Sequence, residues 1–157
     1  MRLGCCGVED RLAAVEREGY DFIEPRALML LPDRPESEFE PVRKQFQEAG
    51  IQAEAFNVFV PGELKITGDA VDFDALTNHV GIVMERASQL GTEIVVFGSG
   101  GARNVPEGFS RSKALEQVKV FAAMAAETAR KSGITIVIEP LAREYCNMIN
   151  SVAEALE

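Results

Sequence analysis

Two hydrophobic patterns alternate along this chain. Helix-like segments, in which apolar residues recur every three or four positions, each close on a glycine, and a short apolar run follows directly. Glycine ends a helix in the left-handed backbone conformation without a Cβ clash. The glycines in question are 31, 41 and 42 residues apart, at Gly19, Gly50, Gly91 and Gly133. The pattern predicts a repeated strand and helix unit, and hence an α/β fold with a parallel sheet.

With an opening strand over residues 2–6, the repeat amounts to five units in 157 residues. A closed barrel of eight such units takes roughly 250 residues, so the chain would form a partial (β/α)₈ barrel, a single truncated domain over residues 1–157. A helix that begins at Ser151 would be cut short at Glu157. The alternative is an open doubly wound sheet of five parallel strands, complete at this length. The hydrophobic pattern alone leaves both architectures open.

Amphipathic helices are predicted over residues 74–90 and 112–131. The apolar stripe of the first consists of Leu76, Val80, Val83, Ala87 and Leu90, and that of the second of Val118, Phe121, Ala122, Ala125 and Ala129. Residues 94–97 and 134–138 are continuous β-branched or aromatic runs, typical of strands buried on both faces. We expect these two strands at the centre of the core.

Composition and charge narrow the class of protein. The chain is 46% hydrophobic and 26% charged, and its apolar runs are too short to span a membrane. Glu9 and Asp10 interrupt the N-terminus before any secretory h-region, so we expect a cytoplasmic protein. Cys5, Cys6 and Cys146 lack disulfide spacing and should be free thiols. The net charge of −9 argues against a nucleic-acid partner, because such binders carry basic patches.

In either parallel architecture, chemistry gathers at the carboxyl ends of the strands. The polar residues placed there are Glu24, Asn57, the loop over residues 98–104, and Glu139. Glu139 follows four Ile or Val residues within a run of five, so its carboxylate would need a cation, an arginine or a metal ion. The alternative is a structural glutamate at the strand end, which pairs with Arg143 or caps the next turn.

The loop over residues 98–104 reads GSGGARN and is a second candidate. It lacks the glycine spacing of nucleotide-binding motifs, and the next helix begins only near Ser110 or Ser112, so no nucleotide cofactor is predicted. Its glycines permit close backbone approach to a polar substrate, with Arg103 beside them. A loop that binds no ligand is the alternative.

Three segments carry a resemblance to a known family when they are taken in order: GYDFIE at 19–24, FGSGGARNVPEGFS at 97–110 and IVIEPLAREYCNMINSVAEAL at 136–156. They resemble the sugar phosphate isomerase/epimerase family, whose fold is the xylose isomerase-like TIM barrel. The resemblance covers the whole chain but only the first five units of the family's domain. It implies a metal-dependent enzyme that isomerises or epimerises a sugar, sugar phosphate or related polyol.

The resemblance also implies roles for particular residues. Glu139 corresponds to a glutamate that binds a divalent metal ion, Mn²⁺, Mg²⁺ or Co²⁺. The same glutamate also moves a proton at a carbon atom of the sugar, through an enediolate intermediate. Asn147 and Asn150 would position the loop after it. The implied substrate-binding residues are Glu24, Ser99, Arg103 and Arg143.

The chain departs from the family pattern in the loop after Glu139, where Ala142 replaces an asparagine and Tyr145 stands near the place of an acid. The family's other three metal ligands belong to strands six to eight, which this sequence lacks. We therefore expect this polypeptide alone to bind metal weakly or not at all and not to turn over sugar. The resemblance leaves open a noncatalytic half-barrel completed by another chain or by a second copy in a homo-oligomer.

A zinc-dependent abasic-site endonuclease of the same barrel class is a less favoured alternative. Enzymes of that kind use several histidines at strand ends. The single histidine, His79, lies within a predicted helix instead and should be a surface or partly buried helix residue.

Overall fold

A computed structural model describes residues 1–7 and 11–156, so Glu9, Asp10 and Glu157 lie outside the described residues. Its strands are β1 (Gly4–Cys6), β2 (Phe22–Glu24), β3 (Ala55–Phe56), β4 (Ile94–Phe97) and β5 (Thr135–Ile138). Its helices are α1 (Leu12–Arg17), the 3₁₀ helix η1 (Ala27–Leu30), α2 (Glu36–Glu48), α3 (Phe73–Gln89), α4 (Gly100–Arg103), α5 (Arg111–Lys131) and α6 (Val152–Ala155). None of these helices is both long enough and apolar enough to cross a membrane.

The strand order decides between the two predicted architectures. β1 pairs with β2, and β3, β4 and β5 pair in that order, all in parallel. Isolated parallel bridges from Ile23 to Ala53 and from Arg26 to Asn57 connect β2 to β3. Neighbours in space are thus neighbours in sequence, as in a barrel, whereas a doubly wound sheet reverses its strand order. The structure is a partial, unclosed (β/α)₈ barrel, as predicted.

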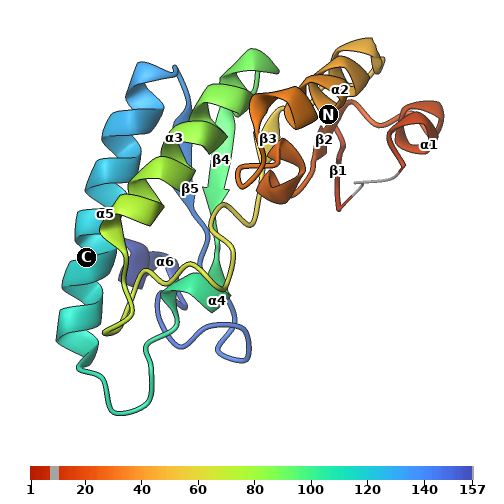
Figure 1. Ribbon diagram of the computed structural model, residues 1–157. Helices are drawn as coiled ribbons and strands as arrows, with labels where there is room; N and C mark the ends of the chain where they lie inside the picture. The colour runs from red at the N-terminus through yellow and green to blue at the C-terminus, as the bar shows by residue number, and fades with distance from the viewer. Residues whose placement is uncertain (8–10, 157) are drawn as a thin grey trace.

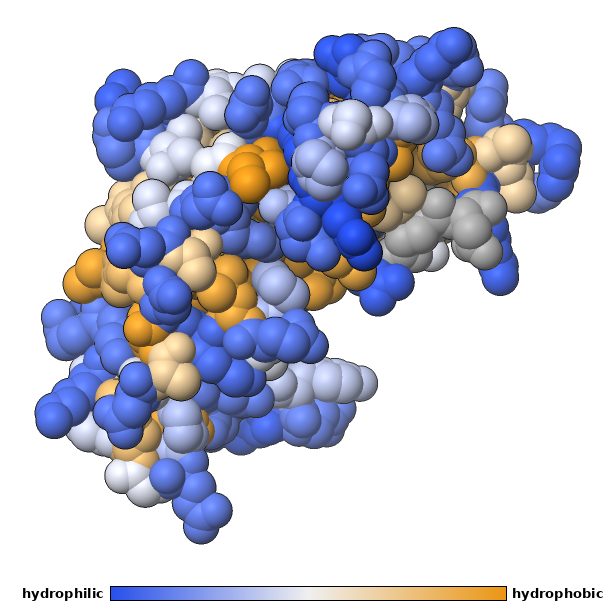
Figure 2. Space-filling model, in the orientation of Figure 1, coloured by the Kyte–Doolittle hydropathy of each residue, from blue (hydrophilic) through white to orange (hydrophobic). Residues whose placement is uncertain are grey.

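Helices α3 and α5 lie beside each other along β4 and β5 (Figure 1). Their bounds match the predicted ranges within one residue, and serine or aspartate caps both: Asp72 accepts from the amide of Ala75 at 2.9 Å, and Ser110 from that of Lys113 at 3.4 Å. The predicted stripes are buried, except that Leu90 and Ala122 are half-buried. Hydrophilic side chains make up most of the face in view in Figure 2, and apolar side chains show between them in smaller patches.

Three of the four glycines that were predicted to end a helix have the left-handed backbone conformation. Gly19, Gly91 and Gly133 have φ values of 82°, 72° and 71°. The prediction for Gly50 is wrong, because α2 ends in extended backbone at Ala49, with φ −68° and ψ 137°. The amide of Gly50 instead donates to Glu16 Oε2 of α1 at 3.3 Å. This glycine therefore connects the end of α2 to α1.

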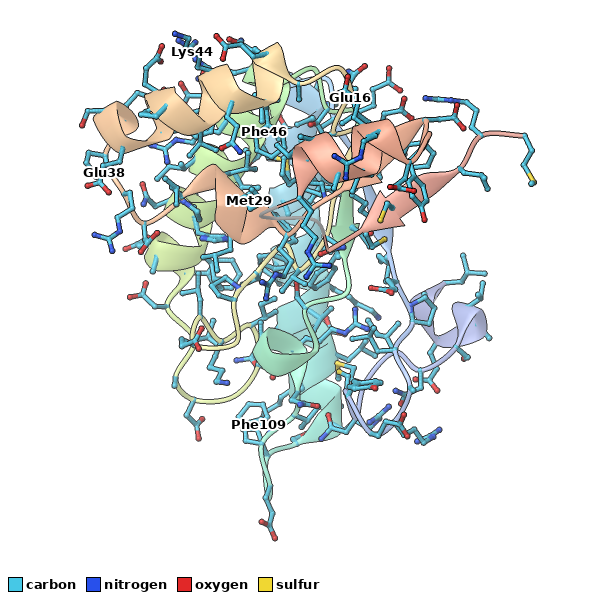
Figure 3. All side chains as sticks on the ribbon, turned by 90° about the vertical axis from the view of Figure 1, so that its right-hand side faces the viewer. Glu16, Met29, Glu38, Lys44, Phe46 and Phe109 are labelled. Atoms are coloured by element: carbon cyan, nitrogen blue, oxygen red, sulfur yellow. The ribbon has the colours of Figure 1, made fainter. Side chains whose placement is uncertain are left out.

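Helix α2 covers β3 with its apolar face. Phe46 points from α2 toward the interior, where its ring packs edge-on against Phe56 with 6.0 Å between centroids. Glu38 and Lys44 on the same helix point away from the interior (Figure 3).

The interior between α3, α5 and the sheet is filled by the packed rings of Phe59, Phe97 and Phe121.

The expectation that β4 and β5 are both buried on both faces is wrong for both strands. Val95 and Phe97 bury one face of β4, but on its other face Ile94 is 37% exposed and Val96 is half-buried. In β5, Thr135, Val137 and Ile138 are exposed. β5 is an edge strand paired only to β4 among the described residues, and α5 covers one of its faces. The apolar run therefore reflects a strand whose second face, toward the barrel interior, stays uncovered here.

Candidate active site

The carboxyl ends of the strands open into one cavity of about 550 Å³. In Figure 1, α4, α6 and the connecting loops gather at these strand ends. The described residues that line the cavity are Cys6, Glu24, Asn57, Val58, Val60, Gly62, Ser99, Gly100, Gly101, Glu139, Leu141 and Tyr145. Three of the predicted site residues, Glu24, Ser99 and Glu139, are thus brought together from β2, the loop after β4, and the end of β5.

The carboxylate of Glu139 lies directly over the backbone of the neighbouring strand. A Cβ atom at Gly98 would stand 2.2 Å from Glu139 Oε2, so only glycine leaves room for the carboxylate in this position. The amide of Glu139 donates to the Phe97 carbonyl at 3.2 Å, which extends the β4 and β5 pairing by one residue. Glu139 itself is exposed toward the cavity.

We expect the Gly98→Ala variant to move the Glu139 carboxylate while the fold is kept. The φ of Gly98 is not in the left-handed region, and the clashing atom is the free end of a flexible side chain. The free energy of unfolding should therefore change by less than about 1 kcal/mol. Sugar affinity at the cavity should fall, as measured by titration calorimetry beside a thermal melt. A Gly81→Ala variant is the control, because an added Cβ there would meet no atom within 4 Å apart from the backbone of its own helix.

Glu24 is held in place at the end of β2. Asn57 Nδ2 donates to Glu24 Oε1 at 3.0 Å and to the Glu24 carbonyl at 3.3 Å, which fixes the carboxylate against the loop after β3. Cys6 lies beside it at the end of β1. Partial burial, and then the negative charge of Glu24, raise the pKa of the Cys6 thiol. The thiol is therefore kept neutral, which makes it a poor nucleophile.

Ser99 connects two loops of the site. Its Oγ accepts a hydrogen bond from the amide of Val60 at 2.9 Å, and its side chain is buried. The loops also touch through glycine: a Cβ at Gly101 would lie 3.1 Å from the Cα of Gly62, and one at Gly100 would lie 2.7 Å from the Tyr145 carbonyl. The glycines of the 98–104 loop thus let backbone segments approach one another, and Ser99 and the backbone of α4 form one wall of the cavity.

The structure places neither predicted arginine in the cavity. Arg103 is fully buried, and its guanidinium donates to the carbonyls of Phe97 at 2.9 Å, Glu139 at 2.8 Å and Ile149 at 3.4 Å. Arg143 is exposed and lies 3.9 Å from Glu154, so the alternative ion pair with Glu139 does not form. Both arginines were predicted to contact substrate, but in the structure their partners are other groups of the protein.

Asn147 and Asn150 hold the loop after Glu139, as predicted. The side chain of Asn147 accepts from the Val105 amide and donates to the Val105 carbonyl, both at 2.9 Å. The Asn150 side chain donates to the carbonyls of Leu141 and Cys146, both at 2.7 Å. These contacts place Tyr145 at the cavity mouth, where it is 68% exposed.

The comparison with protein families decides the classification. A family model described as xylose isomerase-like TIM barrel matches residues 12–157. The chain belongs to this family. No curated protein matches it by sequence.

Solved structures show the xylose isomerase-like fold at low sequence identity. The 3-keto-D-glucoside 4-epimerase YcjR from E. coli has a TM-score of 0.77 and 18% identity, over 99% of this chain and 62% of that one. D-Allulose 3-epimerase from Methylomonas sp., in complex with D-allulose, has a TM-score of 0.75 and 20% identity, over 99% and 57%. The IOLI protein, with a binding zinc atom, has a TM-score of 0.65 and 18% identity, over 99% and 56%. The chain thus spans less than two thirds of these structures.

The described part of this xylose isomerase-like chain offers few grouped metal donors. Within residues 1–7 and 11–156, no three His, Cys, Asp or Glu side chains group in a way that could hold a metal ion. Glu24 and Glu139 share the cavity, but Glu24 is engaged by Asn57. Divalent ions with oxygen ligands take several carboxylate or carbonyl donors. Weak metal binding by this chain remains a prediction, which metal titration by calorimetry would check.

Sequence reasoning missed several residues of the site. Gly98 was predicted only as part of the 98–104 loop, and its contact with Glu139 was missed because that side chain lies 41 positions later. Cys6 could have been found, since it ends the first predicted strand. Tyr145 was noted only as a departure from the family pattern, whereas the structure makes it part of the cavity wall.

His79 is a partly buried helix residue, as predicted. Its Nε2 donates to the Phe59 carbonyl at 2.9 Å, and burial lowers the pKa of the imidazole despite that bond. Below the unfolded pKa of about 6.5, the unfolded chain takes up a proton that the folded one resists. The free energy of unfolding should therefore fall as the pH drops from about 7.5 to about 5.5. Urea denaturation should show a smaller drop in His79→Gln, and an identical drop would contradict this.

Proposed function

We propose that this chain supplies one half of the active site of a sugar isomerase or epimerase. The observation that carries the proposal is the meeting of Glu139 and Glu24 in one open cavity at the carboxyl ends of the strands, in a chain of the xylose isomerase-like family. Epimerases of sugars are among the solved structures that share the fold. The activity of the whole protein is part of the proposal.

Glu139 would move the proton in this reaction. Isomerisation and epimerisation both remove a proton from a carbon next to a carbonyl group, and a carboxylate at the cavity wall suits that step. Gly98 leaves room for this carboxylate against the backbone of the strand end. Glu24, which Asn57 orients, would accept hydrogen bonds from substrate hydroxyl groups. A divalent ion such as Mn²⁺, Mg²⁺ or Co²⁺ would need ligands beyond Glu139 and would supply polarisation of the carbonyl.

The same lining disfavours the abasic-site endonuclease. The phosphates of DNA would face the carboxylates of Glu24 and Glu139, and no lysine or arginine stands among the described lining residues of this cavity. The half-barrel alternative keeps one supporting feature, since Thr135 and Val137, which share the face of β5 that Glu139 continues, are exposed, Val137 at 38%. Further strands or another chain would cover that face.

Proton exchange tests the proposed function directly. The protein expressed from its full reading frame is incubated in D₂O with a panel of aldoses, ketoses, glycosides and their phosphate esters, with and without divalent metal. Mass spectrometry then detects deuterium at carbon, which is the expected result for at least one neutral sugar. Absence of exchange and of binding across the panel would reject the proposal.

A further inference from the structure

A second cavity opens beside the candidate active site. Its volume is about 360 Å³, and it shares Val58 and Gly62 with the first. We call it the outer cavity, and the described residues that line it are Arg26, Leu28, Pro32, Asp33, Val58, Phe59, Pro61, Gly62, Glu63 and His79. A molecule that enters the first cavity therefore has a continuation of the site available to it on the side of η1 and the β3 loop.

The residue between the two cavities is strained. Val58 has a φ of 46°, a left-handed conformation that β-branched residues seldom adopt, and its side chain is 46% exposed. Hydrogen bonds of both neighbouring residues hold it there. The Asn57 amide donates to the Pro25 carbonyl at 3.0 Å, and the Phe59 carbonyl accepts from His79 Nε2 at 2.9 Å. Strain that neighbouring contacts maintain at a cavity wall is typical of binding sites.

The charges that line the two cavities restrict the ligand. Glu24 and Glu139 line the first cavity, and Asp33 and Glu63 line the outer one. Arg26 is the cationic side chain among the described lining residues, and no lysine is found there. A phosphate ester would meet mainly repulsion, whereas sugar hydroxyl groups donate hydrogen bonds to carboxylates. The lining therefore suits an uncharged, hydroxyl-rich molecule.

We infer that the outer cavity is a subsite for a second, uncharged sugar ring, so that the substrate is a glycoside rather than a sugar phosphate. The reacting ring would lie in the first cavity beside Glu139, and the second ring would pass Val58 and Gly62 to lie between η1 and α3. This inference rests on the proposed function, because it extends the same site.

The test is an NMR titration of the protein with D-fructose, fructose 6-phosphate, and the disaccharides maltose, cellobiose and sucrose as probes. All neutral sugars should shift the amide signals of Gly101 and Glu139. A disaccharide should also shift those of Asp33 and Glu63, and should bind at least about 10-fold more tightly than D-fructose. Fructose 6-phosphate should bind more weakly than D-fructose.

A matched pair of variants separates the subsite from the rest. Leu28 is 56% exposed at the outer cavity, and Leu28→Trp should fill that cavity and abolish the advantage of the disaccharide, with D-fructose binding unchanged. Val120→Trp, at a 53% exposed position of α5, should have no effect. Tighter binding of the phosphate, or no advantage of any disaccharide, overturns the subsite while the proposed function stands. If no sugar shifts Glu139, the proposed function fails and the subsite with it.

Discussion

The Glu139→Gln variant should lose the exchange of carbon-bound protons by about 10²–10⁴-fold, the usual contribution of a positioned acid or base. Glutamine has nearly the same shape as glutamate, so it fits the space that Gly98 leaves, but its amide cannot take up a proton at neutral pH. The fold should be kept, because the backbone amide that pairs with Phe97 is unchanged. Deuterium incorporation and the thermal melt are measured on the protein from its full reading frame.

Glu144→Gln is the control for this experiment. Glu144 belongs to the same loop and is exposed, but it does not line the cavity. It changes the net charge by the same amount, so a general electrostatic effect would act in both variants. Equal exchange rates in Glu139→Gln and the unchanged protein would reject the assigned role of Glu139, whatever the control does.

Much of the fold could be predicted because its signals are local. A glycine that ends a helix and an apolar run that follows it are adjacent in sequence, so Gly91 and β4 could be placed from a dozen residues. The conformation of Gly50 could not be predicted in this way, because it depends on contact with Glu16 of another helix. The burial of β5 could not either, since a buried strand and an open edge strand carry the same apolar run until their neighbours are known.

The site divides in the same way. Parallel strands bring their carboxyl ends to one edge, so Glu24 and Glu139 could be expected to share a cavity. The direction of a long side chain is not fixed by that rule. Arg103 follows a glycine-rich strand end and was predicted to face substrate, yet its partners are carbonyl groups at positions 97, 139 and 149. Those acceptors come from three separate segments, and only the folded chain brings them together.

The Arg103→Met variant should show what this buried guanidinium does for the site. Methionine fills much of the space but donates no hydrogen bond. The carbonyls of Phe97 and Ile149 would keep the backbone amides of Glu139 and Leu141 as donors, whereas the Glu139 carbonyl would lose the donor that Arg103 provides. An unsatisfied buried carbonyl costs about 1–3 kcal/mol, partly offset because a buried cation is removed. We expect the free energy of unfolding to fall by about 1–3 kcal/mol, measured by urea denaturation.

Loss of stability alone would not show that Arg103 positions Glu139, and Arg86→Met is the variant that separates the two effects. Arg86 is a second buried guanidinium, which donates to the carbonyls of Leu30 and Arg34 at 2.9 and 3.0 Å and pairs with Glu36 at 3.1 Å. It does not line the first cavity, where D-fructose would bind. Both variants should lose stability, but only Arg103→Met should weaken sugar binding at a temperature where each is folded. The reason is that Arg103 donates a hydrogen bond to the backbone carbonyl of Glu139. Without this bond, the backbone that carries the Glu139 side chain is no longer held in place beside Gly98. Equal sugar affinities in the two variants would reduce Arg103 to a purely structural role.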